Sequence, residues 1–191
     1  MSSLKQHISY LVDLFYPRIC LVCGRALQSH EKHLCMYCIQ NIPRTQFHSH
    51  SEDNIMEHLF RGKVQIEKAV AFFYFTHHGD YRHLIHQIKY RGEKECARYL
   101  GEIYARELGA EFFTDIDLLV PVPLHPKRHK KRGYNQSEWI AMGISDFTGK
   151  DIDRYLIHRC GTSETQTNKG IYKRWENTQN IFALGNTSDA E

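Results

Sequence analysis

Two kinds of hydrophobic pattern alternate along the chain after residue 67. Residues 68–76 (KAVAFFYFT) and 117–123 (DLLVPVP) are apolar runs rich in β-branched or aromatic residues, which predict buried strands. Residues 81–89 and 94–108 instead place apolar side chains at helical spacing, which predicts two amphipathic helices.

The pattern continues with a helix over residues 134–147 and a candidate third strand over residues 151–159. The order strand, helix, strand, helix, strand predicts an α/β fold with a mostly parallel sheet and right-handed connections. Ligands of such sheets bind at the carboxyl ends of the strands, where Pro121-Val122-Pro123 falls.

The part of the chain before residue 68 has a different organisation. Residues 4–16 place apolar side chains at helical spacing and predict a short amphipathic helix. We therefore expect a helix with a cysteine-rich module over residues 1–45, a linker over 46–67 and the α/β domain over 68–191.

Within this module, a stretch of nineteen residues contains two Cys-x-x-Cys pairs. Each pair makes a tight turn that directs two sulfurs at one point, and two pairs supply the four thiolates of a tetrahedral zinc site. The ligands expected are Cys20, Cys23, Cys35 and Cys38. Four protein ligands leave no open position, so a structural role is expected. A redox or disulfide role, iron–sulfur binding, and replacement of one sulfur by His30 or His33 are the alternatives.

The remaining histidines and cysteines give weaker signals. His48, His50 and His58 are expected to be solvated linker residues, with a second metal site as the alternative. Cys96 and Cys160 stand alone and are expected to be buried thiols rather than nucleophiles.

Composition sets limits on these hypotheses. The 191 residues are 41% hydrophobic and 25% charged, as in soluble globular proteins, and the net charge is only +3. Positive charge is therefore a local feature of residues 127–132 rather than a property of the whole chain. No apolar run is long enough to cross a bilayer and no signal-peptide pattern is present, which predicts a cytoplasmic protein without membrane insertion.

A cationic loop is expected between the second strand and the following helix. Its charged residues are Lys127, Arg128, Lys130, Lys131 and Arg132. Lys and Arg side chains beside a helix N-terminus favour phosphate binding, because backbone N–H groups and the helix dipole add to their charge. A solvated surface loop is the alternative. Residues 161–170 are polar and turn-rich, typical of either a mobile lid or an ordinary surface loop.

Four stretches together resemble the ComF family of competence proteins, which are phosphoribosyltransferase-like. They are the cysteine pairs CLVC and CMYC, the helix end LIHQIKYRG, the segment VPVPLHPKRHKKRGYNQS and the segment TQTNKGIYKRWENTQNIF. The resemblance covers nearly the whole chain, and the third stretch is its most specific part.

The resemblance implies a type I phosphoribosyltransferase fold behind a small zinc module. It also implies that the loop after the second strand binds the pyrophosphate of phosphoribosyl pyrophosphate, with Mg²⁺ present. The pyrophosphate-binding residues implied are Lys89, Arg91, Arg132, Gly133, Tyr134, Asn135 and Gln136. The implied flexible loop over the substrate is carried by Thr165, Gln166, Thr167, Lys173 and Arg174.

One family motif has no counterpart in this sequence. The family carries a strand of the form DDVxTTGxT, whose acidic pair holds ribose hydroxyls and metal and whose loop holds the 5′-phosphate. The 191 residues contain no such segment, so either the chain is a truncated piece or the protein lacks the phosphoribosyl half-site, and truncation is favoured.

Three functions are compatible with these patterns. The first is a protein that binds phosphoribosyl pyrophosphate, and that acts as a phosphoribosyltransferase linked to DNA uptake or to nucleotide metabolism. The second is a single-stranded-DNA-binding accessory of DNA uptake without transferase activity, because cations beside aromatic residues can hold phosphates and stack bases. The third is a zinc-stabilised adaptor that contacts other DNA-uptake proteins.

Overall fold

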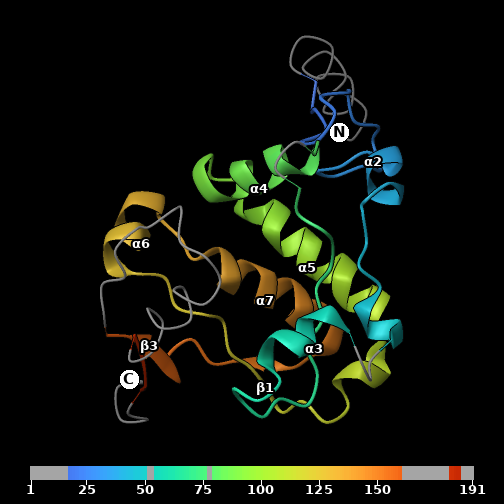
Figure 1. The fold of residues 1–191 in the computed structure, drawn as a ribbon. Helices are drawn as coiled ribbons and strands as arrows, with labels where there is room; N and C mark the ends of the chain where they lie inside the picture. Colours follow the sequence, from blue (N-terminus) through green and yellow to red (C-terminus); the bar gives the residue numbers. More distant parts are fainter. Residues whose placement is uncertain (1–16, 51–53, 77–78, 161–180, 186–191) are drawn as a thin grey trace. The chain divides into compact units, whose positions relative to one another are not determined.

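A computed structural model describes residues 17–50, 54–76, 79–160 and 181–185 (Figure 1). The chain forms two compact units, the first ending at Gln87 and the second beginning at Ile88. The helix predicted over residues 4–16 lies outside the described residues. The division into a module, a linker and a domain stays a prediction.

In the described part of the first unit, the cysteine module is followed by short helical segments and by most of α4 (Tyr81–Tyr90). An antiparallel bridge between Ile19 and Ala26 closes the first cysteine turn, and α2 (Met36–Gln40) follows the third cysteine. A 3₁₀ turn, η1 (Phe47–His50), and α3 (Ile55–Phe60) come next. The side chain of Asn54 caps α3 by accepting a hydrogen bond from the Glu57 N–H at 3.0 Å.

The strand predicted over residues 68–76 is wrong. This segment forms a single antiparallel bridge, Arg44 with Phe73, made by two backbone hydrogen bonds: Tyr74 N–H to the Pro43 carbonyl oxygen and Thr45 N–H to the Phe72 carbonyl oxygen. On one side of the bridge Pro43 has no N–H to donate to a longer ladder, and on the other side Gln46, with a φ of 54°, leaves the extended conformation before η1. Burial on both faces is also wrong, since Tyr74 and Phe75 are about half exposed, at 48% and 52%.

The predicted helices over residues 81–89 and 94–108 are confirmed as α4 (Tyr81–Tyr90) and α5 (Lys94–Leu108). Gly92 adopts a positive φ of 82° between them, a conformation that favours glycine at a helix end. A 3₁₀ turn, η2 (Ala110–Phe113), follows α5.

The main packing contact of the second unit joins α5 to α7 (Gln136–Thr148), which confirms the helix predicted over residues 134–147 (Figure 1). Two glycines let the helices approach backbone to backbone. A Cβ at Gly143 would lie 1.9 Å from the Arg98 carbonyl oxygen, and one at Gly101 would lie 2.2 Å from the Ile140 carbonyl oxygen. At the rim of this contact, the Arg98 guanidinium donates to both oxygens of Asp146, at 2.5 and 2.7 Å.

The strands are short and form two separate pairs. β1 (Leu118–Leu119) is parallel to β2 (Asp151–Ile152), in the register Leu118 to Asp151. β3 (Ile157–Arg159) is antiparallel to β4 (Phe182–Leu184). The predicted combination of helices and strands is therefore confirmed, as a mixed α/β fold with small sheets. The mostly parallel sheet is not seen among the described residues, where one strand pair is parallel and the other antiparallel. The single strand expected over residues 151–159 is instead two strands, because the Asp153 carboxylate accepts hydrogen bonds from two following N–H groups and holds a turn.

The cationic segment after β1 is a helix rather than a loop. α6 (Pro126–Arg132) begins with proline at its first position, after an N-cap at His125. It ends at Gly133, whose φ of 81° and left-handed conformation stop the helix. Lys and Arg are good helix formers, so nothing within the segment opposes the helix. The lysine and arginine side chains of residues 127–132 therefore project from a helix with defined ends.

The lone cysteines differ from each other. Cys96 is fully buried in α5, as expected, whereas Cys160 is exposed, so the prediction of a buried Cys160 is wrong. Of the helices in the part of the chain that the structure describes, none combines the length and the apolar character that crossing a bilayer requires.

Candidate functional site

The four predicted cysteines come together in the first unit. The sulfur atoms of Cys20, Cys23, Cys35 and Cys38 all lie within 4.8 Å of one another. The Cys23 and Cys35 sulfurs are 3.7 Å apart, close to the edge of about 3.8 Å that a tetrahedron with zinc–sulfur bonds of about 2.3 Å requires. Among the described residues no histidine joins this group, so the four-cysteine set fits a metal ion such as zinc.

Backbone N–H groups donate hydrogen bonds to sulfurs of the cysteine cluster. The Cys35 N–H donates to the Cys20 sulfur at 3.3 Å, and the Cys38 N–H donates to the Cys35 sulfur at 3.4 Å. Burial raises the pKa of the Cys20 thiol, but backbone hydrogen bonds outweigh burial and lower this pKa to about 7. Burial and the neighbouring sulfurs raise the pKa of Cys38. Thiolate character at Cys20 favours metal binding, because the thiolate is the ligand form.

Glu31 supports the cluster, and its role was not predicted from the sequence. It lies between the two cysteine pairs and is only 5% exposed. Its carboxylate accepts hydrogen bonds from the Gln28 N–H at 2.8 Å and from the Met36 N–H, the first residue of α2, at 2.7 Å. These two bonds, aided by Arg25, lower the pKa of Glu31. One carboxylate thus fixes the loop that separates the cysteine pairs and the start of the second pair's helix.

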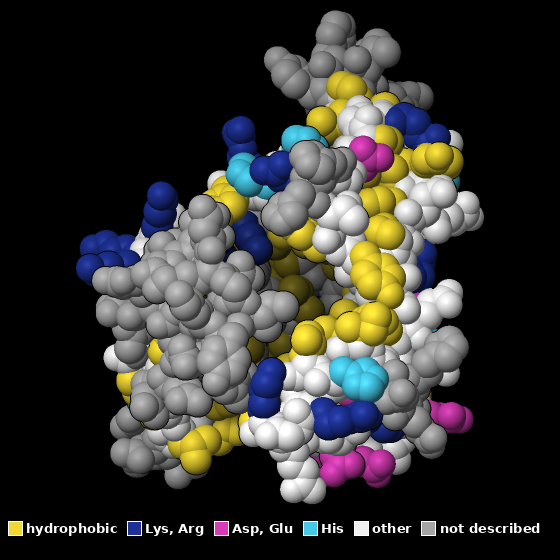
Figure 2. Space-filling model, viewed as in Figure 1, with side chains coloured by type: hydrophobic (Ala, Val, Ile, Leu, Met, Phe, Trp, Pro, Cys, Tyr) yellow, Lys and Arg dark blue, Asp and Glu magenta, His cyan; other side chains and the backbone are white. Residues whose placement is uncertain are grey.

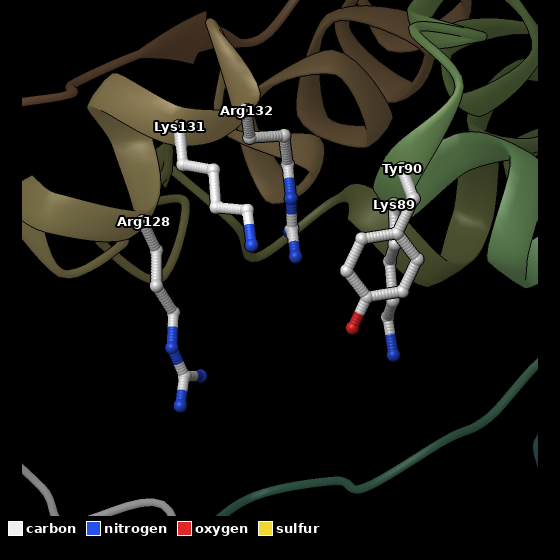
Figure 3. A pocket seen from close by; sticks show the side chains of 5 residues that line it. All are labelled: Lys89, Tyr90, Arg128, Lys131 and Arg132. Atoms are coloured by element: carbon white, nitrogen blue, oxygen red, sulfur yellow. The ribbon is translucent and has the colours of Figure 1, made fainter.

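A pocket of about 400 Å³ lies in the second unit, between the end of α4 and α6. Its lining residues are Lys89, Tyr90, Arg128, Lys131 and Arg132. Figure 3 shows their side chains extending from the two helices into the same space. We call this the cation pocket, because the described lining contains four cations and no carboxylate. Figure 2 shows Lys and Arg side chains gathered on the surface over α6.

Arg132 is the most constrained cation of the pocket. It is half-buried, its Nη1 donates to the side-chain oxygen of Gln136, and its guanidinium lies 5.4 Å from the centre of the Tyr90 ring. An aromatic face and an amide oxygen hold the guanidinium in place while leaving it cationic. Among the predicted residues, Lys89 and Arg132 line the pocket and Gln136 orients Arg132.

Three of the other predicted residues have structural contacts. Gly133 ends α6 in the left-handed conformation. The hydroxyl of Tyr134, which is only 8% exposed, donates to the Ile88 carbonyl oxygen, and burial raises the pKa of this hydroxyl. The side chain of Asn135 accepts from the Ser137 N–H at 3.1 Å to cap α7, and it donates to the Val122 carbonyl oxygen at 3.0 Å. These residues position α6 and α7, and their contact with an anion stays a prediction.

The structure thus separates the predicted residues into groups. Arg91 is exposed and is not among the lining residues of the cation pocket. Arg128, Lys131 and Tyr90 line it but were absent from the residues that the family motif implies. Arg128 and Lys131 were nevertheless among the cations of the expected cationic loop, and their spacing of three residues places them on one face of α6. The predicted loop residues Thr165, Gln166, Thr167, Lys173 and Arg174 lie outside the described residues.

Comparisons with known proteins identify relatives. No family model matches the chain, and no solved structure matches it. The DNA utilization protein YhgH of Escherichia coli K12 is 31% identical over 174 residues, which cover 87% of this chain and 70% of that protein. The protein of the same name from Shigella flexneri is 30% identical over the same length and coverage. The one from Salmonella typhi is 32% identical over 105 residues, covering 53% of this chain and 46% of that protein.

The fold and the two sites define the class: a mixed α/β protein with a four-cysteine cluster that fits a metal ion and with a cationic pocket. The chain belongs to the family of DNA utilization proteins YhgH.

Proposed function

We propose that this chain is a ComF-type, phosphoribosyltransferase-like protein that acts in DNA utilization and binds the pyrophosphate of phosphoribosyl pyrophosphate in the cation pocket. One observation carries the proposal: Lys89, Arg128, Lys131 and Arg132 converge on one pocket whose described lining has no carboxylate. The names of the relatives support the link to DNA, and the parallel pairing of β1 with β2 just before α6 supports the type I phosphoribosyltransferase fold.

The chemistry of the pocket suits a diphosphate. Pyrophosphate carries several negative charges in a small volume, and four cations held on two helices offset them without costly rearrangement. Arg132 offers a planar fork for two phosphate oxygens, whereas the lysines supply point charges. Mg²⁺, where present, would supply further positive charge beside the phosphates. In a transfer reaction these residues would stabilise the charge that develops on the departing pyrophosphate. Zinc in the four-cysteine cluster would serve folding.

Isothermal titration calorimetry with pyrophosphate and with phosphoribosyl pyrophosphate, both in Mg²⁺, tests this function. Replacing Lys131 or Arg132 by methionine removes a charge but keeps the stem, and each change should weaken binding about tenfold or more, as expected for a charge-assisted hydrogen bond. Lys127→Met is the matched control, because Lys127 lies on α6 but does not line the pocket. Absence of binding by the wild-type protein, or an equal loss in Lys127→Met, would overturn the proposal.

Single-stranded DNA is the second candidate ligand. The observation that favours it is Tyr90, which is 64% exposed beside the cations and offers a stacking face. Binding that uses four cations should weaken with a slope of about −3 in log affinity against log salt, since each phosphate contributes about −0.7. Tyr90→Ala should weaken oligonucleotide binding far more than pyrophosphate binding, which loses only the contribution of the ring to holding Arg132. A protein that retains neither ligand fits the adaptor function instead.

A further inference from the structure

A second cavity, of about 380 Å³, lies in the same unit beside the beginning of α6. We call it the tyrosine cavity. Its walls include Pro123, Pro126, Tyr155, Ile157, His158 and Arg159. The volume falls within the range of about 300–1,000 Å³ that small-molecule sites occupy. No site residue predicted from the sequence lines this cavity.

The walls of the tyrosine cavity are mostly flat and apolar. Two prolines and Ile157 present rigid hydrocarbon surfaces, and the Tyr155 side chain is 65% exposed. The tyrosine backbone is fixed from two sides. Its N–H donates to the Asp153 carboxylate at 2.7 Å, and Gly185 packs so closely that a Cβ there would lie 2.0 Å from the Tyr155 carbonyl oxygen. An exposed aromatic ring on a fixed backbone is suited to stacking on another ring.

Each polar side chain in the tyrosine cavity can donate a hydrogen bond, and the described lining contains no carboxylate. The Arg154 guanidinium is neutralised by Glu138, which lies outside the lining, at 2.6 Å. Arg159 is half-buried, and its pKa is lowered by burial and by the nearby charge of Arg128. Together with His158, these donors suit the carbonyl oxygens and ring nitrogens of a heterocycle.

α6 connects the tyrosine cavity to the cation pocket. Pro126, at the start of α6, lines the tyrosine cavity, whereas Arg128, Lys131 and Arg132 line the cation pocket. At a rise of about 1.5 Å per residue, Pro126 and Arg132 are separated by about 9 Å along the helix axis, the scale of one nucleoside. The charge of Arg128 also contributes to the lowered pKa of Arg159, so the two cavities are within electrostatic reach of each other.

We propose that the tyrosine cavity is the nucleobase subsite of a free nucleotide whose phosphates occupy the cation pocket. The base stacks on Tyr155 between the prolines and accepts hydrogen bonds from His158 and Arg159, and the sugar passes the first turn of α6. The inference rests on the proposed function for its phosphate end and adds the class of molecule attached to those phosphates.

Calorimetry of the full chain with adenosine, guanosine and uridine diphosphates, compared with pyrophosphate, tests the subsite. At least one diphosphate should bind about tenfold tighter than pyrophosphate, the gain expected when a base stacks on an aromatic ring. Tyr155→Ala should abolish that gain and leave pyrophosphate binding unchanged, and Tyr155→Phe should keep it. Tyr37→Ala is the control, because Tyr37 is equally exposed, at 64%, but lies in the other unit.

The outcomes separate the two proposals. Pyrophosphate binding without any gain from a base overturns the nucleobase subsite alone, as does an equal loss of both ligands in Tyr155→Ala. Nucleotide binding that depends on Tyr155 without any pyrophosphate binding supports the subsite and overturns the pyrophosphate function. A wild-type protein that binds neither ligand overturns both. Circular dichroism of each variant checks that the fold is kept.

Discussion

Replacing Gly143 by alanine tests how closely α5 and α7 must approach. The new Cβ would lie 1.9 Å from the Arg98 carbonyl oxygen and 2.8 Å from the Glu102 nitrogen, both backbone atoms. Because backbone cannot rotate away as a side chain can, the helices must separate by about 1 Å, and overpacking of this kind costs about 3 kcal/mol. Alanine recovers about 1 kcal/mol through its higher helix propensity. The net expectation is a loss of about 2 kcal/mol.

For a unit of about 100 residues, this loss lowers the melting temperature by about 8–16 °C. Thermal unfolding followed by circular dichroism, with zinc held constant, measures it. Gly101→Ala is the companion variant, because its Cβ would meet the Ile140 carbonyl oxygen at 2.2 Å across the same contact. One separation of the helices relieves both clashes, so the double variant should cost less than the sum of the single variants. A Gly143→Ala protein as stable as wild type, or strictly additive costs, would refute this packing.

Three further outcomes follow from contacts described above. Cys38→Ser, or chelation of the wild-type protein, should remove one bound zinc per chain, measured by metal analysis, with loss of structure in the cysteine module. Glu31→Gln should weaken zinc retention in a chelator competition. Folding lowers the pKa of Glu31 from 4.5, so the stability that the Glu31 carboxylate contributes is present above pH 4.5 and is lost as the pH falls through the folded pKa. The difference in unfolding free energy between wild type and Glu31→Gln should therefore shrink in acid. Tyr134→Phe leaves the buried Ile88 carbonyl without its hydroxyl donor and should cost about 1–2 kcal/mol in denaturant unfolding; no change would show that water replaces the donor.

Local patterns in the sequence predicted the features that depend on local forces. The spacing of apolar residues gave α5 with the bounds Lys94–Leu108 that the structure shows, and the cysteine spacing gave the cluster of four sulfurs. Both are set within a few turns of chain, where periodicity and turn geometry dominate. For α6, the sequence contains the terminal signals Pro126 and Gly133, but residues 127–132 include no apolar side chain whose spacing would indicate a helix.

Features that depend on distant partners could not be predicted in the same way. The apolar residues 68–76 have strand composition, but the neighbouring segment limits pairing to one bridge, since Pro43 lacks an N–H and Gln46 has a positive φ. Glu31 resembles any surface glutamate until the two N–H groups that it accepts from are known. The tyrosine cavity joins residues 123–126 to residues 154–159 and Gly185, a combination that only the folded chain reveals.

The segment from Arg132 to Gln136 carries one further consequence, for mutational scanning. Each of its five consecutive residues has a different role. Arg132 lines the cation pocket and Gln136 orients Arg132. Gly133 ends α6, Tyr134 hydrogen-bonds to the Ile88 carbonyl, and Asn135 caps α7. Alanine at any of the five would reduce function in a cell, yet for unrelated reasons. A growth assay would therefore score the whole segment as one active-site motif. Measuring protein abundance in parallel would separate the two kinds of residue. The growth defects of alanine variants at Gly133, Tyr134 and Asn135 should follow a lower amount of folded protein, whereas those at Arg132 and Gln136 should occur at normal abundance.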